Sequence, residues 1–480
     1  MFFKEKIRNI IAILCLTLLT TSCGVKKKFD IDTTLNNRSI KNDLKEDFSF
    51  TGTVQPAIDI IFNVHLDPVG TEGSLYERID KYKQHRAALQ WLTQLAEQEK
   101  FKITASMTGS YAEFVVSRNH EKDFRRFMPG EKHILGTHLH AEYKKKEDRV
   151  VPFHWTYAPP PAAENAQQVF TDCLSYINKI FLNLGYSETD NHLLHGTQAH
   201  AKNMRALYGA SRNKNAYPNR FDIIEGKRGY YHPYRSNPNT NLMTAKEELH
   251  QPFIAIPSAS YIFGYNGPHG PEGMTYGTLP YIQRDFILEY LEWRYANKHN
   301  VKAKPWVFGF GIHPHQLLED SLDTRRSLEL FFKWINSNFA TNTVNYATLP
   351  GSSDKYIKWE RVNAGTNMYR DINPEQDGVQ ADIKTWRIHN AVKNNNLHYT
   401  ATRKIKSTEI YELADKNGLK AMLIIPGKQN DVKMGLFFQN KVDCITVSTT
   451  EIGIDPKNIV ITEEPVLLVT HHQTEIPDTK

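Results

Sequence analysis

Strand-like and helix-like segments alternate from residue 51 to about residue 350, and this alternation restricts the possible folds more than any other feature. Ile58 to His65 is a mostly apolar run typical of a buried strand, whereas Leu75 to Glu99 has the leucine spacing of a helix. The other predicted strands are Phe101 to Ser106, Lys132 to Leu139, 191 to 196, Phe253 to Ser258, Pro305 to His313 and Val344 to Leu349. The other predicted helices are Gly109 to Val116, 163 to 184, 277 to 298 and 324 to 339. Repeated strand–helix units predict an α/β fold with a parallel sheet, and this many strands favours a distorted β/α-barrel.

The last hundred residues have a different pattern. Ala381 to Thr470 consists of short apolar or alternating runs separated by turn residues, which predicts a small C-terminal antiparallel β-sandwich. We therefore expect a barrel over residues 51–365 and an accessory β-sandwich domain over residues 366–480.

The first residues have the pattern of an export signal. A cationic start precedes the apolar run Ile10 to Leu19, which is shorter than the roughly 20 residues that span a bilayer. Small residues then lead to Cys23, which resembles the lipidated cysteine of a bacterial lipobox. Thr20 stands where such a motif usually has leucine, so a simple cleaved signal or an uncleaved anchor remains an alternative. We expect a signal peptide over residues 1–23, a flexible tether over 24–50 and a lipid-anchored protein of the bacterial cell envelope.

Composition excludes several classes of protein. The formal net charge of +6 is small and partly N-terminal, so nucleic acid is not an expected partner. Four cysteines in 480 residues cannot form a disulfide scaffold, and ordinary Gly and Pro contents with 11% aromatic residues exclude disorder. The unusual number is 20 histidines, most of them before residue 350. Their positions are the clue to the chemistry.

Three predicted strands end in metal-capable residues at i and i+2, a spacing that directs both side chains to one face of a strand. These pairs are His65 with Asp67, His138 with His140, and His313 with His315. The carboxyl ends of parallel barrel strands converge on one mouth, so the pairs can form one site. Imidazole and carboxylate together suit a divalent ion such as zinc, iron or manganese. Pro314 weakens the third pair, because it breaks strand geometry.

Three further residues are candidate substrate contacts. His195 follows a predicted strand, although a simple loop explains it equally well. Tyr231 and Arg235 lie in a loop rich in Asn and Pro, where aromatic rings can stack on sugars and cations can bind hydroxyls or anionic groups. Core packing is the alternative for both.

The arrangement resembles the metal-dependent polysaccharide deacetylases and the wider superfamily of glycoside hydrolase/deacetylase β/α-barrels. That family has an acidic metal ligand after the first strand, a His motif after the third and a His after a late strand, which here are Asp67, His138 and His313. The resemblance covers about residues 55–350 and is strongest at Gly-Thr-His-Leu-His, residues 136–140.

The sequence departs from the family in two places. Leu66 stands where classical members have a second aspartate, and Glu142 stands where they have the second His ligand. The His-x-Asp form is closer to the branch that includes α-mannosidase-like glycosidases. His65 is therefore a candidate ligand or general base, His140 an alternative second imidazole and Glu142 a weaker candidate base.

The resemblance implies a metal-dependent hydrolase that removes acyl groups from a polysaccharide or oligosaccharide. In this reading Asp67, His138 and His140 hold a divalent ion, zinc being the expected one, and His65 and His313 are the catalytic histidines. Two alternatives remain: a metal-dependent glycoside hydrolase on the same barrel, and a non-catalytic surface glycan-binding lipoprotein with a degenerate site.

Overall fold

The structure is a computed structural model. It describes residues 50–67, 75–139, 142–144, 155–157, 163–188, 194–196, 220–224, 231–236, 253–257, 262–263, 266–267, 270–271, 279–318, 322–365, 383–405, 407–427, 432–433, 443–446, 460–461 and 464–471. Residues 1–49, with the predicted signal, Cys23 and tether, lie outside the described part. Within the described part, no helix is long and apolar enough to cross a membrane.

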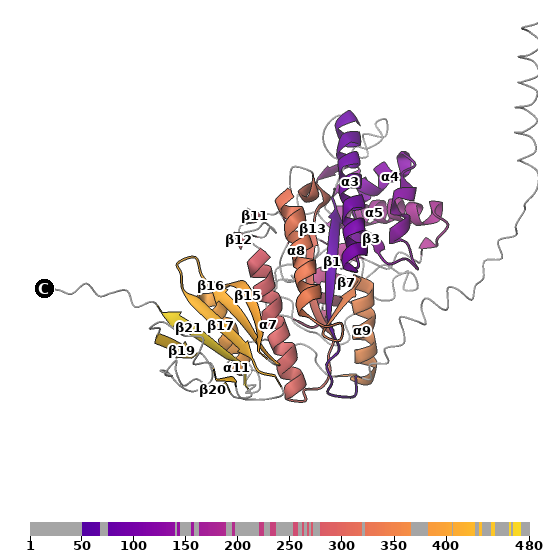
Figure 1. Ribbon diagram of the computed structural model, residues 1–480. Coiled ribbons are helices and arrows are strands. Elements are labelled where there is room, and N and C mark those ends of the chain that lie inside the picture. Colours follow the sequence, from indigo (N-terminus) through magenta and orange to yellow (C-terminus); the bar gives the residue numbers. More distant parts are fainter. Residues whose placement is uncertain are drawn as a thin grey trace, which may run out of the picture. The chain divides into compact units, whose positions relative to one another are not determined.

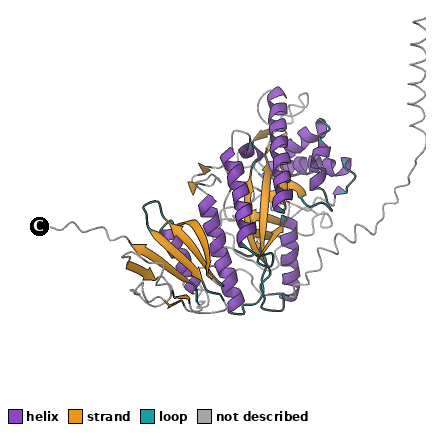
Figure 2. Cartoon of the chain, in the orientation of Figure 1, coloured by secondary structure: helices purple, strands orange, loops and turns teal. Residues whose placement is uncertain are grey.

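A parallel sheet forms the centre of the fold (Figures 1 and 2). Its strands pair in the order β10-β13-β1-β2-β3-β6, and β14 pairs with the first half of β1. Their bounds are β1 Ile58–Leu66, β2 Thr104–Met107, β3 Ile134–Leu139, β6 Leu194–Gly196, β10 Ile262–Phe263, β13 Trp306–Ile312 and β14 Val344–Ala347. Every pairing in this sheet is parallel, as the strand–helix alternation predicts.

A second, three-stranded sheet lies between β6 and β13 of the first sheet. Its order is β7-β9-β8, with bounds β7 Arg220–Ile224, β8 Tyr234–Ser236 and β9 Phe253–Pro257. β7 and β9 are parallel, β7 lies beside β6 and β9 lies beside β13. The strands β1, β2, β3, β6, β7, β9 and β13 therefore follow one another around a distorted barrel in chain order. The predicted fold class is confirmed.

Helices cover the outside of this barrel. The helices are α3 Leu75–Glu99, α4 Gly109–Ser117, α5 Ala163–Asn183, α7 Leu279–Lys298, α8 Leu322–Asn338 and α9 Leu349–Val362, with the 3₁₀ helices η1 Glu121–Phe127 and η3 Pro314–Leu317. The sequence pattern predicted α3, α4, α5, α7 and α8, whereas β7 and α9 were not predicted.

The two faces of β1 differ in chemistry. Ile58, Ile60, Phe62, Val64 and Leu66 belong to the main hydrophobic core, which includes Phe331 and Phe332 of α8 and leucines of α3. The ring of Phe62 packs edge-to-face on Phe332 at 5.7 Å. Asp59, Asn63 and His65 alternate with these apolar residues and are also buried. The inner face of β1 therefore carries three buried polar side chains beside the apolar Ile61, which is costly unless the polar groups bind one another or a ligand.

The C-terminal part is an antiparallel module, as predicted, but its main described strands form a single sheet where two packed sheets of a sandwich were expected. Its five-stranded sheet has the order β15-β16-β17-β21-β19, and helix α11 (Ile383–Asn394) precedes it. One face joins the main core through Tyr411, Leu423 and Leu467, and α7 packs beside β15. The other face carries Ile410, Ile424, Val466 and Leu468.

The strands of this module are β15 His398–Ile405, β16 Thr408–Ala414, β17 Lys420–Ile425, β19 Asp443–Thr446 and β21 Val466–His471. Short pairs elsewhere are β4 Glu142–Lys144 with β5 Trp155–Tyr157, β11 Asn266–Gly267 with β12 Gly270–Pro271, and β18 Val432–Lys433 with β20 Val460–Ile461.

Candidate active site

The carboxyl ends of β1, β3 and β13 meet at a single carboxylate, that of Asp67. Its Oδ2 lies 2.9 Å from Nε2 of His313, and its Oδ1 lies 3.6 Å from Nε2 of His138. These residues are separated by 71 positions or more along the chain (138 minus 67). The parallel register brings them together, as the strand-end spacing predicts.

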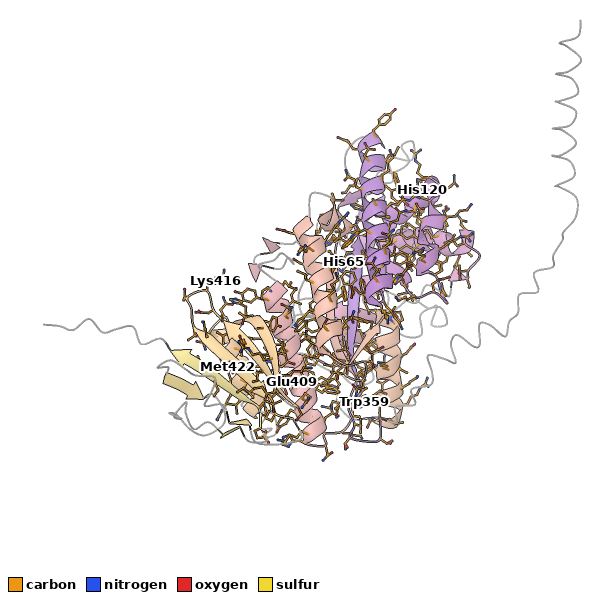
Figure 3. The ribbon with its side chains drawn as sticks, viewed as in Figure 1. His65, His120, Trp359, Glu409, Lys416 and Met422 are labelled. Carbon is orange, nitrogen blue, oxygen red and sulfur yellow. The ribbon has the colours of Figure 1, made fainter. Side chains whose placement is uncertain are left out.

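His65 completes this group, which we call the strand-end cluster: His65, Asp67, His138 and His313. The ring of His65 lies 4.7 Å from that of His138 and 5.0 Å from that of His313, measured between centroids. Figure 3 labels His65 on β1. Three imidazoles and one carboxylate thus occupy a volume that one small ligand could contact.

The cluster is closed on the protein side and open at Asp67. His65, His138 and His313 are buried residues, at 2%, 0% and 9% exposure, whereas the side chain of Asp67 is 23% exposed. A ligand or water molecule can therefore reach the carboxylate from solvent while the imidazoles form the inner wall.

Gly311 makes room for His65. It pairs with Asn63 in the register of β1 with β13, and a Cβ at this position would lie 3.3 Å from His65 Nε2 and 3.3 Å from the Asn63 carbonyl oxygen. Phe308, Phe310 and Ile312, which alternate with the glycines, pack into the main core. The Phe-Gly-Phe-Gly sequence thus gives β13 one packing face and one open face.

The turn after β13 fixes the backbone of His313. Its N–H donates to Oε1 of Gln316 at 2.9 Å, and Pro314 begins the helix η3. The ring of His315 stacks on that of His313 at 5.2 Å with an interplanar angle of 29°. Burial and then the nearby His313 lower the pKa of His315 below its usual range.

A buried hydrogen bond supports β1 just below the cluster. Ser106 Oγ on β2 donates to Asn63 Oδ1 at 2.9 Å, and both side chains are fully buried. This bond ties β1 to β2 two residues before His65.

Several predicted site residues lie where their side chains are not described. His195 on β6 is paired in register with His138, so its backbone is beside the cluster. Glu142 begins β4. His140 and Cys23 fall outside the described residues. Their predicted roles stay predictions.

Tyr231 and Arg235 are engaged with other parts of the protein. Arg235 forms a bidentate pair with Glu360 of α9, at 2.9 and 2.8 Å. The Tyr231 hydroxyl lies 3.4 Å from both ring nitrogens of His389 on α11, and its ring stacks on Trp306 at 6.2 Å. Burial and nearby carboxylates raise the pKa of Tyr231 well above its usual range. The described contacts are those of packing, and substrate binding by either residue stays a prediction.

The strand-end cluster fits a divalent ion in its donor chemistry. Two imidazole nitrogens and a carboxylate are common zinc ligands, and neighbouring ligands of a tetrahedral zinc are about 3.4 Å apart for bonds of about 2.1 Å. The 3.6 Å separation between Asp67 Oδ1 and His138 Nε2 is close to that spacing, whereas the 2.9 Å separation between Asp67 Oδ2 and His313 Nε2 is that of a hydrogen-bonded pair. Among the described residues, however, no group of three or more His, Cys, Asp or Glu side chains is arranged to hold a metal. A third protein ligand would have to come from elsewhere, and His140 is the predicted one.

Sequence reasoning missed the residues that support the cluster. Gly311, Gln316 and Ser106 have no metal-binding or acid–base chemistry, so a search for reactive residues passes over them. The alternation of Phe and Gly before His313 is the one signal that could have indicated Gly311.

Comparison with known proteins gives only distant likenesses. No protein family matches the sequence, and no curated protein does. Among solved structures, a probable polysaccharide deacetylase from Pseudomonas aeruginosa PAO1 is 13% identical with a TM-score of 0.39, covering 64% of this chain and 92% of that one. The Puue allantoinase is 13% identical with a TM-score of 0.41, covering 65% and 93%. The 4-alpha-glucanotransferase from Thermococcus litoralis is 13% identical with a TM-score of 0.35, covering 76% and 64%. Similarity at this level says nothing about activity, so a proposal for the function has to rest on the strand-end cluster and on the sequence motifs.

Proposed function

We propose that this protein is a metal-dependent hydrolase that removes acyl groups from a glycan. The observation that carries the proposal is the carboxylate of Asp67 set between the imidazoles of His138 and His313 at the mouth of a parallel barrel. The mouth formed by strand carboxyl ends is where barrel enzymes place their chemistry.

Asp67 and His138 would hold the ion, with His140 as the third ligand. A bound divalent ion lowers the pKa of its water and polarises a carbonyl. His313 would donate a proton to the leaving oxygen or nitrogen of the sugar, since its Nε2 faces the open carboxylate. His65, buried against both other imidazoles, would act as a further ligand or as the base that takes a proton from water.

The substrate class follows from the resemblance of residues 55–350 to the deacetylase barrels. An acylated polysaccharide or oligosaccharide would bind at the exposed side of Asp67. Anchoring through a lipidated Cys23 would place the enzyme at the bacterial cell envelope, where such polymers occur.

Metal content and acyl release together test the proposal. Purified wild-type protein, Asp67→Ala and His138→Ala would be analysed for bound metal and incubated with a panel of acetylated glycans. We expect about one zinc-type ion per wild-type chain, a loss of metal in both variants, and acetate release by the wild type alone. Arg361→Gln, an exposed change on α9, is the matched control and should behave as the wild type.

Three outcomes would contradict the proposal in different ways. A wild-type protein without stoichiometric metal rules out the metal-dependent mechanism. Release of reducing sugar ends without acetate indicates a glycoside hydrolase. Glycan binding with neither product indicates a binding protein with a degenerate site.

A further inference from the structure

Two buried polar side chains beside the strand-end cluster have unused hydrogen-bonding atoms. Within the described part of the chain, neither ring nitrogen of His85 has a hydrogen-bond partner, and neither does the hydroxyl of Tyr111. His85 is 1% exposed and Tyr111 0% exposed. Their rings stack on each other at 5.9 Å with an interplanar angle of 19°. Buried polar atoms without partners are rare and usually have an unseen ligand or a functional role.

This pair is positioned next to the candidate active site. His85 comes from α3 and Tyr111 from α4, so the two side chains approach from the helical layer. The ring of His85 lies 6.5 Å from that of His315, which in turn stacks on His313. A row of rings thus runs from Tyr111 through His85 and His315 to the cluster.

Both side chains are neutral at physiological pH. Burial, followed by Lys81 and His315, lowers the pKa of His85 to about 3. Burial likewise raises the pKa of Tyr111 above its usual range. A neutral imidazole offers one donor and one acceptor and a phenol offers both, which suits a water molecule better than an ion.

The separation from His315 also suits water. A centroid distance of 6.5 Å is too long for a direct hydrogen bond and is compatible with one bridging molecule. Buried water needs two to four polar partners, and His85, Tyr111 and His315 have donors and acceptors enough for that number. His315 is an exposed residue, so a fixed hydrogen-bond partner would help to hold its ring in one orientation.

We propose that His85 and Tyr111 are positioning residues, which hold buried water against His315 and thereby keep His313 aligned with Asp67. This inference rests on the proposed hydrolase function. His85 of α3 and Tyr111 of α4 would thus affect the reaction rate without contacting the reacting groups.

The test uses substitutions that remove the polar atoms and keep the rings. His85→Phe and Tyr111→Phe each leave the stacked pair in place. If the polar atoms serve function, both variants should show an unchanged or higher Tm, because a buried phenyl ring keeps the packing and avoids the desolvation cost of burying a polar group. They should also show kcat for acyl release about tenfold lower, with KM and metal content unchanged, as for other supporting residues of metal sites. His85→Gln, which restores a donor and an acceptor, should recover part of kcat.

Tyr82→Phe is the matched control. Tyr82 neighbours Tyr111 at 5.8 Å, but its hydroxyl donates to Asp123 Oδ2 at 3.0 Å. Losing this bond should lower Tm and leave kcat as in the wild type.

Several results would overturn the inference. Wild-type kcat in both Phe variants excludes a positioning role, and a lower Tm in both assigns the pair to stability alone. A raised KM with unchanged kcat would mean that the pair contacts substrate directly. Absence of turnover by the wild type refutes the proposed hydrolase rather than this inference. In that event the direction of the Tm change still decides whether His85 and Tyr111 are structural.

Discussion

An aspartate lies near each end of β1, but the two carboxylates have different surroundings. Asp59, near the amino end, is 0% exposed, and its Oδ1 accepts from Lys355 Nζ and from Asn345 Nδ2. Asp67, beyond the carboxyl end, is partly exposed and faces two imidazoles. Figure 3 shows His65 on β1 at a distance from Trp359 of α9, the helix that supplies Lys355.

This difference separates stability from chemistry. Lys355 balances the charge of Asp59, and Asn345 donates a hydrogen bond to the same carboxylate oxygen, so this carboxylate has fixed partners within the protein. The carboxylate of Asp67 faces imidazoles, which are common metal ligands, and the proposed function places the chemistry here. In β/α-barrels the carboxyl ends of the strands hold the active site and the amino ends contribute to stability.

Asp67→Asn should have the largest effect on activity. The substitution keeps the shape of the side chain and removes its charge, so metal binding and the alignment of His313 are both lost. We expect kcat/KM for acyl release to fall by about 10³-fold or more, which corresponds to about 4 kcal/mol of transition-state stabilisation. The free energy of unfolding should change by less than about 1 kcal/mol, because Asp67 is partly solvated. Steady-state kinetics and urea unfolding measure the two effects. A large loss of stability would make Asp67 resemble Asp59 and break the comparison.

Asp59→Asn should show the reverse pattern. Lys355 would lose its buried anionic partner, and we expect the free energy of unfolding to fall by about 2–3 kcal/mol, below the full cost of a buried pair because Lys355 is 27% exposed. The kcat of the folded fraction should stay within twofold of the wild type. A strong loss of kcat in protein that is folded by circular dichroism would contradict this division of roles.

The sequence predicted the fold and the position of the cluster residues for a common reason. Side-chain alternation in strands is local, so Asp67, His138 and His313 could be placed at strand ends without knowledge of tertiary structure. His85 could not be placed, because a single histidine on a helix is indistinguishable from a core or surface residue until its neighbours are known. β7 was missed because five residues, Arg220–Ile224, carry too little periodicity to identify a strand.

Gly311→Ala should separate the packing of the cluster from its chemistry. The new Cβ would lie 3.3 Å from both His65 Nε2 and the Asn63 carbonyl oxygen, closer than ordinary contact, so His65 must shift. We expect kcat to fall about tenfold with little change in metal content, since misplacement of a catalytic group is costly in rate.

Gly351→Ala on α9 is the matched control for this change. Its Cβ would lie at the same distance, 3.3 Å, from Thr348 Oγ1. This hydroxyl caps helix α9 and is not part of the strand-end cluster. Activity should be unaffected. Equal kcat in Gly311→Ala and the wild type would show that His65 has room to move and takes no part in the reaction.

The smallest effect concerns two histidines at opposite ends of β3. His138 joins the cluster, whereas His133, just before the strand, accepts the backbone N–H of Ile103 through Nδ1 at 3.1 Å. Burial, then Lys132 and Arg126, lower the pKa of His133 to about 4. The folded pKa is below the unfolded value of 6.5, so the unfolded chain binds the proton first as the pH falls. This contribution to stability is therefore present above pH 6.5 and is lost between about pH 6.5 and pH 4.

His133→Asn should reduce this acid sensitivity, because its Oδ1 can accept the Ile103 N–H and does not titrate. Urea unfolding at pH 7 and pH 5 measures the effect. We expect the wild type to lose about 1 kcal/mol more than the variant over this interval. An equal loss in both proteins would mean that His133 can be protonated without giving up its bond to Ile103. His133 would then give no evidence that the amino ends of the strands depend on fixed hydrogen bonds. The contrast between the two ends of the barrel would rest on Asp59 and Asp67 alone.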